Sequence, residues 1–230
     1  RPPSGGRGRA PAAAAASSLL DRNTAGMPAT YQHARTSART RLVSVRDGPA
    51  PACPSYSHER MAGKSSDERA LVAAARGGDE AAFEALFRLH WPRAHRAAWL
   101  VVHDAAAAED IAQESFLAAV RALDRFDRRR PFGPWLHRIV VNRAIDWARA
   151  RALRGEVELA AEPAGAAARN GFDRGLVDSL RLLPPEQRAV VVLRHLLGYT
   201  PGEIARLLDL PRGTVNSRLR RGLDAMRTRL

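Results

Sequence analysis

The spacing of the apolar side chains restricts this chain to helical structure. Between residues 61 and 154, and again between 176 and 230, large apolar residues recur at intervals of three and four, as in Phe83, Leu86 and Phe87. Such spacing places one apolar stripe along an α-helix. No segment shows the sustained alternation of apolar and polar residues that is typical of a half-buried strand. We therefore predict an all-α fold.

Composition divides the chain into four segments. Residues 1–60 are rich in Gly, Pro and Arg and poor in large apolar residues, so they cannot bury enough apolar surface to offset the entropy lost on ordering. We expect them to form a disordered basic extension, and Met61 could be the native start of the protein. Residues 155–175 return to Gly, Pro and Ala and are expected to be a flexible linker. The remaining segments, 61–154 and 176–230, are predicted to be two small helical domains.

Local start and stop signals predict four helices in the first domain. Pro92 is expected to kink or divide the second of them, because proline lacks the backbone N–H that a helix interior needs. The stretch 127–134 contains two prolines and a glycine and is expected to be irregular. The predicted order is a short helix that stops at Gly77, a second capped by Asp79, a third capped by Asp104 and a fourth from Trp135 to about Arg151.

The charge of the chain indicates a polyanionic partner. The formal net charge is +13, and 36 of the 37 basic residues are arginines, since Lys64 is the single lysine. So basic a chain is expected to bind nucleic acid or an anionic membrane surface. No apolar run approaches the roughly 20 residues needed to cross a bilayer, so we expect no membrane insertion and a cytoplasmic location. The lone cysteine, Cys53, excludes a disulfide framework and a cysteine-based zinc site.

The segment from residue 200 to 226 predicts a helix-turn-helix. Thr200 and Pro201 are typical of a helix start, residues 209–213 break that helix, and a basic helix follows from Thr214. The tight turn usually has glycine where this chain has Asp209, and aspartate tolerates a left-handed backbone better than most residues. In this motif the second helix enters the major groove. Its outward polar side chains are the candidate DNA ligands Arg212, Thr214, Asn216, Ser217, Arg218, Arg220 and Arg221.

Three motifs, in order, resemble the extracytoplasmic-function (ECF) group of bacterial RNA polymerase sigma factors. Residues 108–116 (AEDIAQESF) resemble the polymerase-binding helix of that family. Residues 131–146 (PFGPWLHRIVVNRAID) resemble its −10-reading segment. Residues 183–194 (LPPEQRAVVVLR) and 213–221 (GTVNSRLRR) resemble its −35-reading domain. The resemblance covers about residues 66–230 and implies two helical domains, region 2 and region 4, that bind core polymerase and promoter DNA and are often inhibited by an anti-sigma factor.

The resemblance also implies roles for individual side chains. The acidic face of the third helix would dock on core polymerase, and its members are Glu109, Asp110, Gln113 and Glu114. The arginine-rich loop near residues 125–134 offers cations and aromatic rings, which suit an unpaired strand and an extruded base. Together with the helix that follows, it would read the −10 element through Arg128, Arg129, Arg130, Phe132, Trp135, Arg138, Asn142 and Arg143.

Two other classes of protein, a helix-turn-helix regulator and a metalloenzyme, explain less of the sequence. A helix-turn-helix regulator acting at an operator would explain residues 176–230 but gives the acidic face and the arginine-rich loop no role. A metalloenzyme would need ligands from His90, His95 and His103, whose spacing is not that of a metal-binding helical pair. No phosphate-binding loop or serine nucleophile motif is present in the sequence. We therefore expect a non-enzymatic protein without cofactor or metal.

Overall fold

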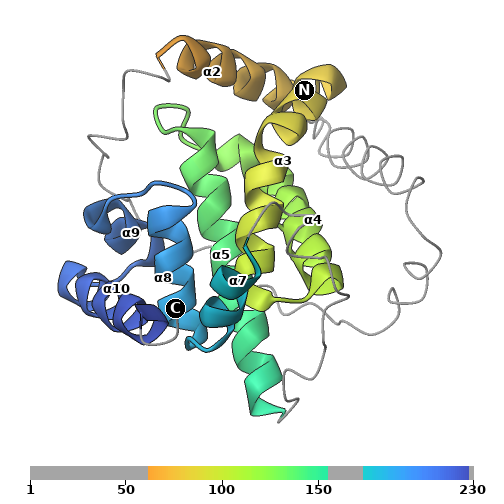
Figure 1. Cartoon of the computed structure of the whole chain (residues 1–230). Coiled ribbons are helices and arrows are strands. Elements are labelled where there is room, and N and C mark those ends of the chain that lie inside the picture. Colours follow the sequence, from red (N-terminus) through yellow and green to blue (C-terminus); the bar gives the residue numbers. More distant parts are fainter. Residues whose placement is uncertain (1–61, 155–172, 228–230) are drawn as a thin grey trace, which may run out of the picture.

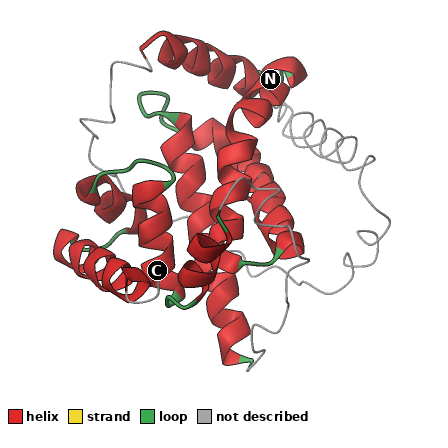
Figure 2. Cartoon of the chain, in the orientation of Figure 1, coloured by secondary structure: helices red, strands yellow, loops and turns green. Residues whose placement is uncertain are grey.

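The computed structural model describes residues 62–154 and 173–227, and every regular element in those ranges is helical (Figures 1 and 2). This confirms the all-α prediction for the described part of the chain. The predicted extension 1–60 and most of the predicted linker lie outside it. The elements are α2 (Ala62–Arg76), α3 (Glu80–Val102), α4 (Ala105–Ala122), the 3-10 turn η4 (Leu123–Arg125), α5 (Phe132–Leu153), α7 (Arg174–Arg181), α8 (Pro185–His195), α9 (Pro201–Leu208) and α10 (Arg212–Arg227).

Helices α3, α4 and α5 pack against one another, and α2 lies across one end of this bundle (Figure 1). The apolar stripes predicted from the sequence form its core, where Trp99, Phe116 and Leu136 are at most 1% exposed. The predicted caps are present as well. Asp79 accepts from the backbone N–H of Ala81 at 2.9 Å. Asp104 likewise accepts from the N–H of Ala107 at 2.9 Å.

Pro92 neither ends nor divides the second helix, because α3 runs unbroken from Glu80 to Val102. The expectation of a division there was wrong. Pro92 lies on the exposed side of the helix, as does Arg88, whose carbonyl lacks the N–H that proline cannot supply. The helix continues because Ala94, Ala97 and Val101 on the opposite side are fully buried. Tertiary packing therefore outweighs the local cost of the proline.

Helix α5 begins at Phe132, three residues before the predicted start at Trp135. Pro134 is tolerated because the first N–H groups of a helix lack intrahelical partners. The N-cap residue Pro131 supplies no side-chain hydrogen bond. Glu68 of α2 caps the helix instead, since its Oε1 accepts from the N–H of Phe132 at 3.0 Å and of Gly133 at 3.2 Å. A residue 64 positions away thus sets this helix start.

The second half contains the predicted helix-turn-helix. Thr200 and Glu203 form a capping box at the start of α9. Asp209 ends that helix with φ 55°, so the aspartate adopts the left-handed conformation expected of it. Helix α10 begins at Arg212, two residues before the predicted start, and Val215 at its inner face is fully buried.

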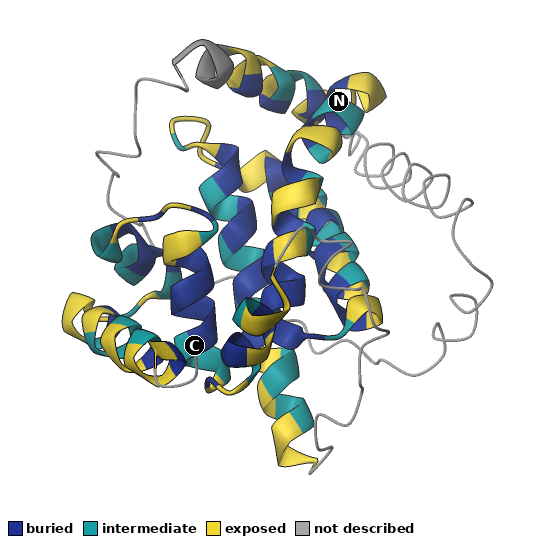
Figure 3. Cartoon of the chain, in the orientation of Figure 1, coloured by how far each residue is buried: buried dark blue, intermediate teal, exposed yellow. Residues whose placement is uncertain are grey.

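The two halves are packed together in this structure. Helix α8 lies against α3 and α5, and Figure 3 shows buried residues on all three helices. Arg188 of α8 is 5% exposed, and its guanidinium donates to the carbonyls of Leu180, Leu183 and, in the other half, Val101. In the described residues, no helix is both long and apolar enough to span a membrane.

Candidate functional site

The predicted polymerase-binding face of α4 is partly exposed. Asp110 and Glu114 are exposed, whereas Gln113 and Glu109 are half-buried. Glu109 turns toward α3, where its Oε2 lies 3.4 Å from Nε2 of His95. It also accepts from Nε2 of Gln113 at 3.1 Å. Burial, followed by the charge of Asp110, raises the pKa of Glu109. The exposed charge of this face therefore comes from Asp110 and Glu114.

Glu114 connects this face to α5. Its Oε2 accepts from the Arg143 guanidinium at 2.5 Å, although the two residues were predicted to bind different partners. The Glu114 carboxylate is 59% exposed and the Arg143 side chain 31%, so solvent screens the pair. Such a pair exchanges readily when either side chain meets a stronger partner.

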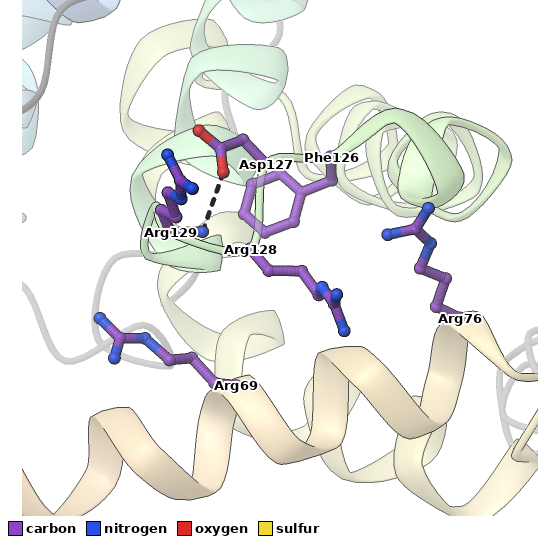
Figure 4. A pocket seen from close by; sticks show the side chains of 6 residues that line it. All are labelled: Arg69, Arg76, Phe126, Asp127, Arg128 and Arg129. Carbon is purple, nitrogen blue, oxygen red and sulfur yellow. Dashed lines mark hydrogen bonds between the residues drawn. The ribbon is translucent and has the colours of Figure 1, made fainter.

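A pocket of about 500 Å³ lies between α2 and the loop that precedes α5 (Figure 4). Two of the predicted −10 ligands, Arg128 and Arg129, line it together with Phe126 and Asp127. The opposite wall carries Arg69 and Arg76 of α2, which were not among the predicted site residues. Four arginines and one aspartate give the lining a strongly positive charge. This is the composition of a site for a phosphate-bearing ligand.

Three aromatic rings support the loop behind the pocket. The ring of Phe126 lies 4.6 Å from that of Trp135 and 5.9 Å from that of Phe132, measured between centroids. Phe132 is only 3% exposed and also packs on His90, at 5.2 Å. Trp135 is half-buried. In this conformation Phe132 holds the loop in place and presents no ring surface to a ligand.

The remaining predicted −10 residues lie along the loop and α5. Nε of Arg130 lies 3.7 Å from Oδ2 of Asp127. Arg138 and Asn142 are half-buried on α5, each in reach of solvent. The structure thus brings Arg128 and Arg129 to one pocket, and leaves Arg138, Asn142 and Arg143 farther along the helix.

Helix α10 separates a polar face from a buried one. Val215, Gly222 and Met226 are buried. Thr214, Ser217 and Arg218 are half-buried at the margin, and Ser217 Oγ donates to the carbonyl of Thr214 at 2.9 Å. The exposed candidate DNA ligands are Arg212, Asn216, Arg220 and Arg221.

His90, His95 and His103, the candidate metal ligands weighed in the sequence, do not come together in one cluster. No group of three metal-binding side chains occurs within residues 62–154 and 173–227. Burial, with Arg188 and Arg181 next, lowers the pKa of His103 to about 2. Burial, with His90 and Arg93 next, lowers the pKa of His137 to about 3. Both are therefore neutral core residues at physiological pH.

Sequence reasoning missed three residues that organise the site. Glu68 caps α5 from a distant helix, and Arg188 ties α8 to three carbonyls of its own half and one of the other half. Gly222 lets α10 approach α8 closely, because a Cβ there would lie 3.0 Å from Cγ2 of Val191. Glu68 stands between Asp67 and Arg69 in a charged stretch, so the sequence does not mark it as a buried cap. Only the glycine inside a helical pattern could have been noticed.

Comparisons with known proteins match both halves of the chain. Residues 86–154 match the family Sigma-70 region 2, and residues 174–226 match Sigma-70, region 4. The ECF RNA polymerase sigma factor SigW of Bacillus subtilis (strain 168) is 32% identical over 172 residues, which cover 66% of this chain and 91% of that protein. The ECF RNA polymerase sigma factor SigM of Mycobacterium tuberculosis (strain ATCC 25618 / H37Rv) is 35% identical over 179 residues, 75% of this chain and 88% of that protein.

A solved structure agrees with these matches. CnrH, determined in complex with the cytosolic domain of CnrY, is 31% identical, with a TM-score of 0.54 and coverage of 70% of this chain and 95% of CnrH. The helical fold, the helix-turn-helix and the two matched regions define an RNA polymerase sigma factor. Within that class, the chain belongs to the ECF group.

Proposed function

We propose that this sigma factor binds core RNA polymerase through the exposed face of α4 and directs it to promoters. The proposal rests on one observation. The same chain holds an acidic face on α4, an arginine-lined pocket and a basic helix-turn-helix. The acidic face suits a basic docking surface on the polymerase. The other two elements suit DNA.

The promoter would be read at two places. The loop before α5, with Arg128, Arg129 and Arg130, would hold the unpaired −10 strand and so assist melting. The exposed face of α10 would read the −35 element, since Arg and Asn bond base edges in the major groove. This assigns −10 recognition to residues 61–154 and −35 recognition to residues 176–230, joined by the predicted linker. No covalent bond is made or broken, so the protein acts as an initiation factor and not as an enzyme.

Two further expectations follow from this function. CnrH was solved with the cytosolic domain of CnrY, which supports a regulatory partner, the predicted anti-sigma factor, for this chain as well. A protein that works on bacterial promoters acts in the cytoplasm.

The rival function is a helix-turn-helix regulator that binds an operator without polymerase. A pull-down with purified core polymerase separates the two. Wild type should retain core polymerase, and Asp110→Arg should lose it because the substitution reverses an exposed charge at the centre of the α4 face. Asp178→Arg, a charge reversal at an exposed position of α7, is the control and should retain it. Absence of retention by wild type would favour the operator-binding regulator.

A further inference from the structure

Helix α2 lies outside both matched sigma regions, yet it forms one wall of the arginine-lined pocket. Arg69 and Arg76 project from the same side of α2, seven residues or two turns apart, toward the loop that carries Arg128 (Figure 4). The motifs recognised in the sequence give α2 no role. The pocket-lining arginines of α2 therefore lie outside the matched regions.

The positive charge of the pocket is largely uncompensated. Within the described residues, no carboxylate lies within 4 Å of the guanidinium groups of Arg69, Arg128 or Arg129. Arg76 has a partner in Asp124, but Nε and Oδ1 are 3.7 Å apart and the aspartate side chain is 70% exposed. An exposed ion pair of this kind contributes little to stability, so Arg76 can exchange Asp124 for an anionic ligand.

The only acid in the lining is already engaged. Oδ1 of Asp127 accepts from the backbone N–H of Arg129 at 3.0 Å, which shapes the turn of the loop. Its other oxygen lies 3.7 Å from Nε of Arg130. Asp127 therefore builds the loop more than it neutralises the pocket, and Arg69, Arg128 and Arg129 have no carboxylate partner among the described residues to compete with an anionic ligand.

The two walls are held in a fixed relation. Glu68, the neighbour of Arg69, is 9% exposed and caps α5 directly after the loop. Its Oε1 also lies 3.4 Å from Nε2 of His90. Burial alone would raise the pKa of Glu68, but His90 and the two backbone N–H groups together lower it, so the cap stays ionised. The pocket is thus pre-organised for its ligand.

We propose that Arg69 and Arg76 bind the phosphodiester backbone of an unpaired DNA strand, opposite Arg128 and Arg129. This deepens the proposed melting function and rests on it. Arginine binds phosphate in a bidentate manner. A pocket of about 500 Å³ is large enough to admit a nucleotide. Helix α2 would thereby extend the track that holds the displaced strand.

Binding of a fluorescent oligothymidylate of about 12 nucleotides to the full chain, followed by anisotropy across a KCl series, tests this proposal. Each lost phosphate contact should make the slope of log K against log salt shallower by about 0.7 for single strands. Arg69→Ala/Arg76→Ala should therefore reduce the slope by about 1.4 and weaken binding at low salt, near 50 mM KCl. Arg88→Ala/Arg174→Ala removes the same charge from exposed positions outside the pocket and should retain the wild-type slope.

Three outcomes would overturn the proposal. The first is that the wild-type chain binds no single-stranded DNA near 50 mM KCl. The second is that Arg69→Ala/Arg76→Ala shows the same salt slope as the control variant. The third is that this variant loses as much affinity for a duplex of the same length as for the single strand. Thermal unfolding of both variants checks that they are folded. The core-polymerase pull-down reads the proposed function separately. If the wild-type chain binds polymerase but the pocket variant has the same salt slope as its control, only the proposed role of α2 is rejected and the proposed function stands.

Discussion

The Tyr199 hydroxyl lies 2.7 Å from Nδ1 of His137, and this buried hydrogen bond joins the two sigma regions of the chain. Tyr199 precedes α9 in region 4 and is 2% exposed, and His137 lies on α5 in region 2 and is 3% exposed. The rings meet edge to face, with centroids 5.9 Å apart. The contact therefore combines a polar and an aromatic interaction at the centre of the interface between the halves.

Tyr199→Phe should destabilise the folded chain by about 1–2 kcal/mol, because it leaves a buried ring nitrogen of His137 without its partner. The free energy of unfolding from urea titration measures this loss. The ring packing is retained in the variant, so the change reports the hydroxyl alone. A variant as stable as wild type would mean that the bond contributes nothing to the interface.

Glu68→Ala should lower the free energy of unfolding by about 1–3 kcal/mol, because it leaves the N–H groups of Phe132 and Gly133 without an acceptor at the buried start of α5. Glu68→Gln keeps one acceptor oxygen and should lose less. Limited proteolysis in the loop at residues 127–131 gives a second readout, because the loop loses its anchor only in the alanine variant. Equal stability of the alanine variant and wild type would contradict the capping role.

Acidification should destabilise the protein through its buried histidines. The pKa of His103 is about 2 in the folded state and that of His137 about 3, whereas the unfolded chain has ordinary values near 6.5. Above about pH 6.5 both states hold these residues neutral, and below it only the unfolded state takes up the protons. Stability should therefore fall from about pH 6.5 downward, by about 2 kcal/mol per histidine at about pH 5.

His103→Asn isolates one of these contributions. His103 has φ 51°, a left-handed conformation that asparagine also adopts. The variant should lose less stability than wild type between about pH 7.5 and about pH 5, as measured by urea unfolding at both values. His195→Asn, at an exposed position, should keep the wild-type pH dependence. If the two variants show the same pH dependence, burial of His103 does not govern it.

The two glycines of α10 should respond differently to alanine. A Cβ at Gly213 meets nothing within 4 Å, so Gly213→Ala should gain up to about 1 kcal/mol of helix propensity. A Cβ at Gly222 would lie 3.0 Å from Cγ2 of Val191, so Gly222→Ala should lose about 1–2 kcal/mol by forcing α10 from α8. Unfolding free energies of the free protein measure both. A higher unfolding free energy for Gly222→Ala would show that α8 and α10 can move apart with little loss of stability.

Local chemistry made much of this fold predictable. Thr200 and Pro201 mark the start of α9 because capping and proline preference are properties of adjacent residues. The end of α9 at Asp209 was predictable too, because aspartate itself tolerates a positive φ. The start of α5 was missed because its cap, Glu68, comes from another helix. The unbroken course of α3 past Pro92 depends likewise on packing that only the folded chain creates.

The candidate site was predictable to a similar extent. The arginines of the loop and the exposed face of α10 follow from sequence pattern. The position of Arg69 and Arg76 opposite Arg128 does not, because it depends on how α2 crosses the bundle. The burial of Phe132 in an aromatic cluster is also a result of tertiary packing.

Run-off transcription with sigma-free core polymerase tests whether this chain selects the start sites of transcription. Genomic promoter fragments are the templates, and the full chain is the only added factor. Discrete transcripts that start at defined sites should appear only when the chain is present. They should disappear with Asp110→Arg and persist with Asp178→Arg. Polymerase that starts at the same sites with and without the chain, on every template, would contradict the role of a sigma factor.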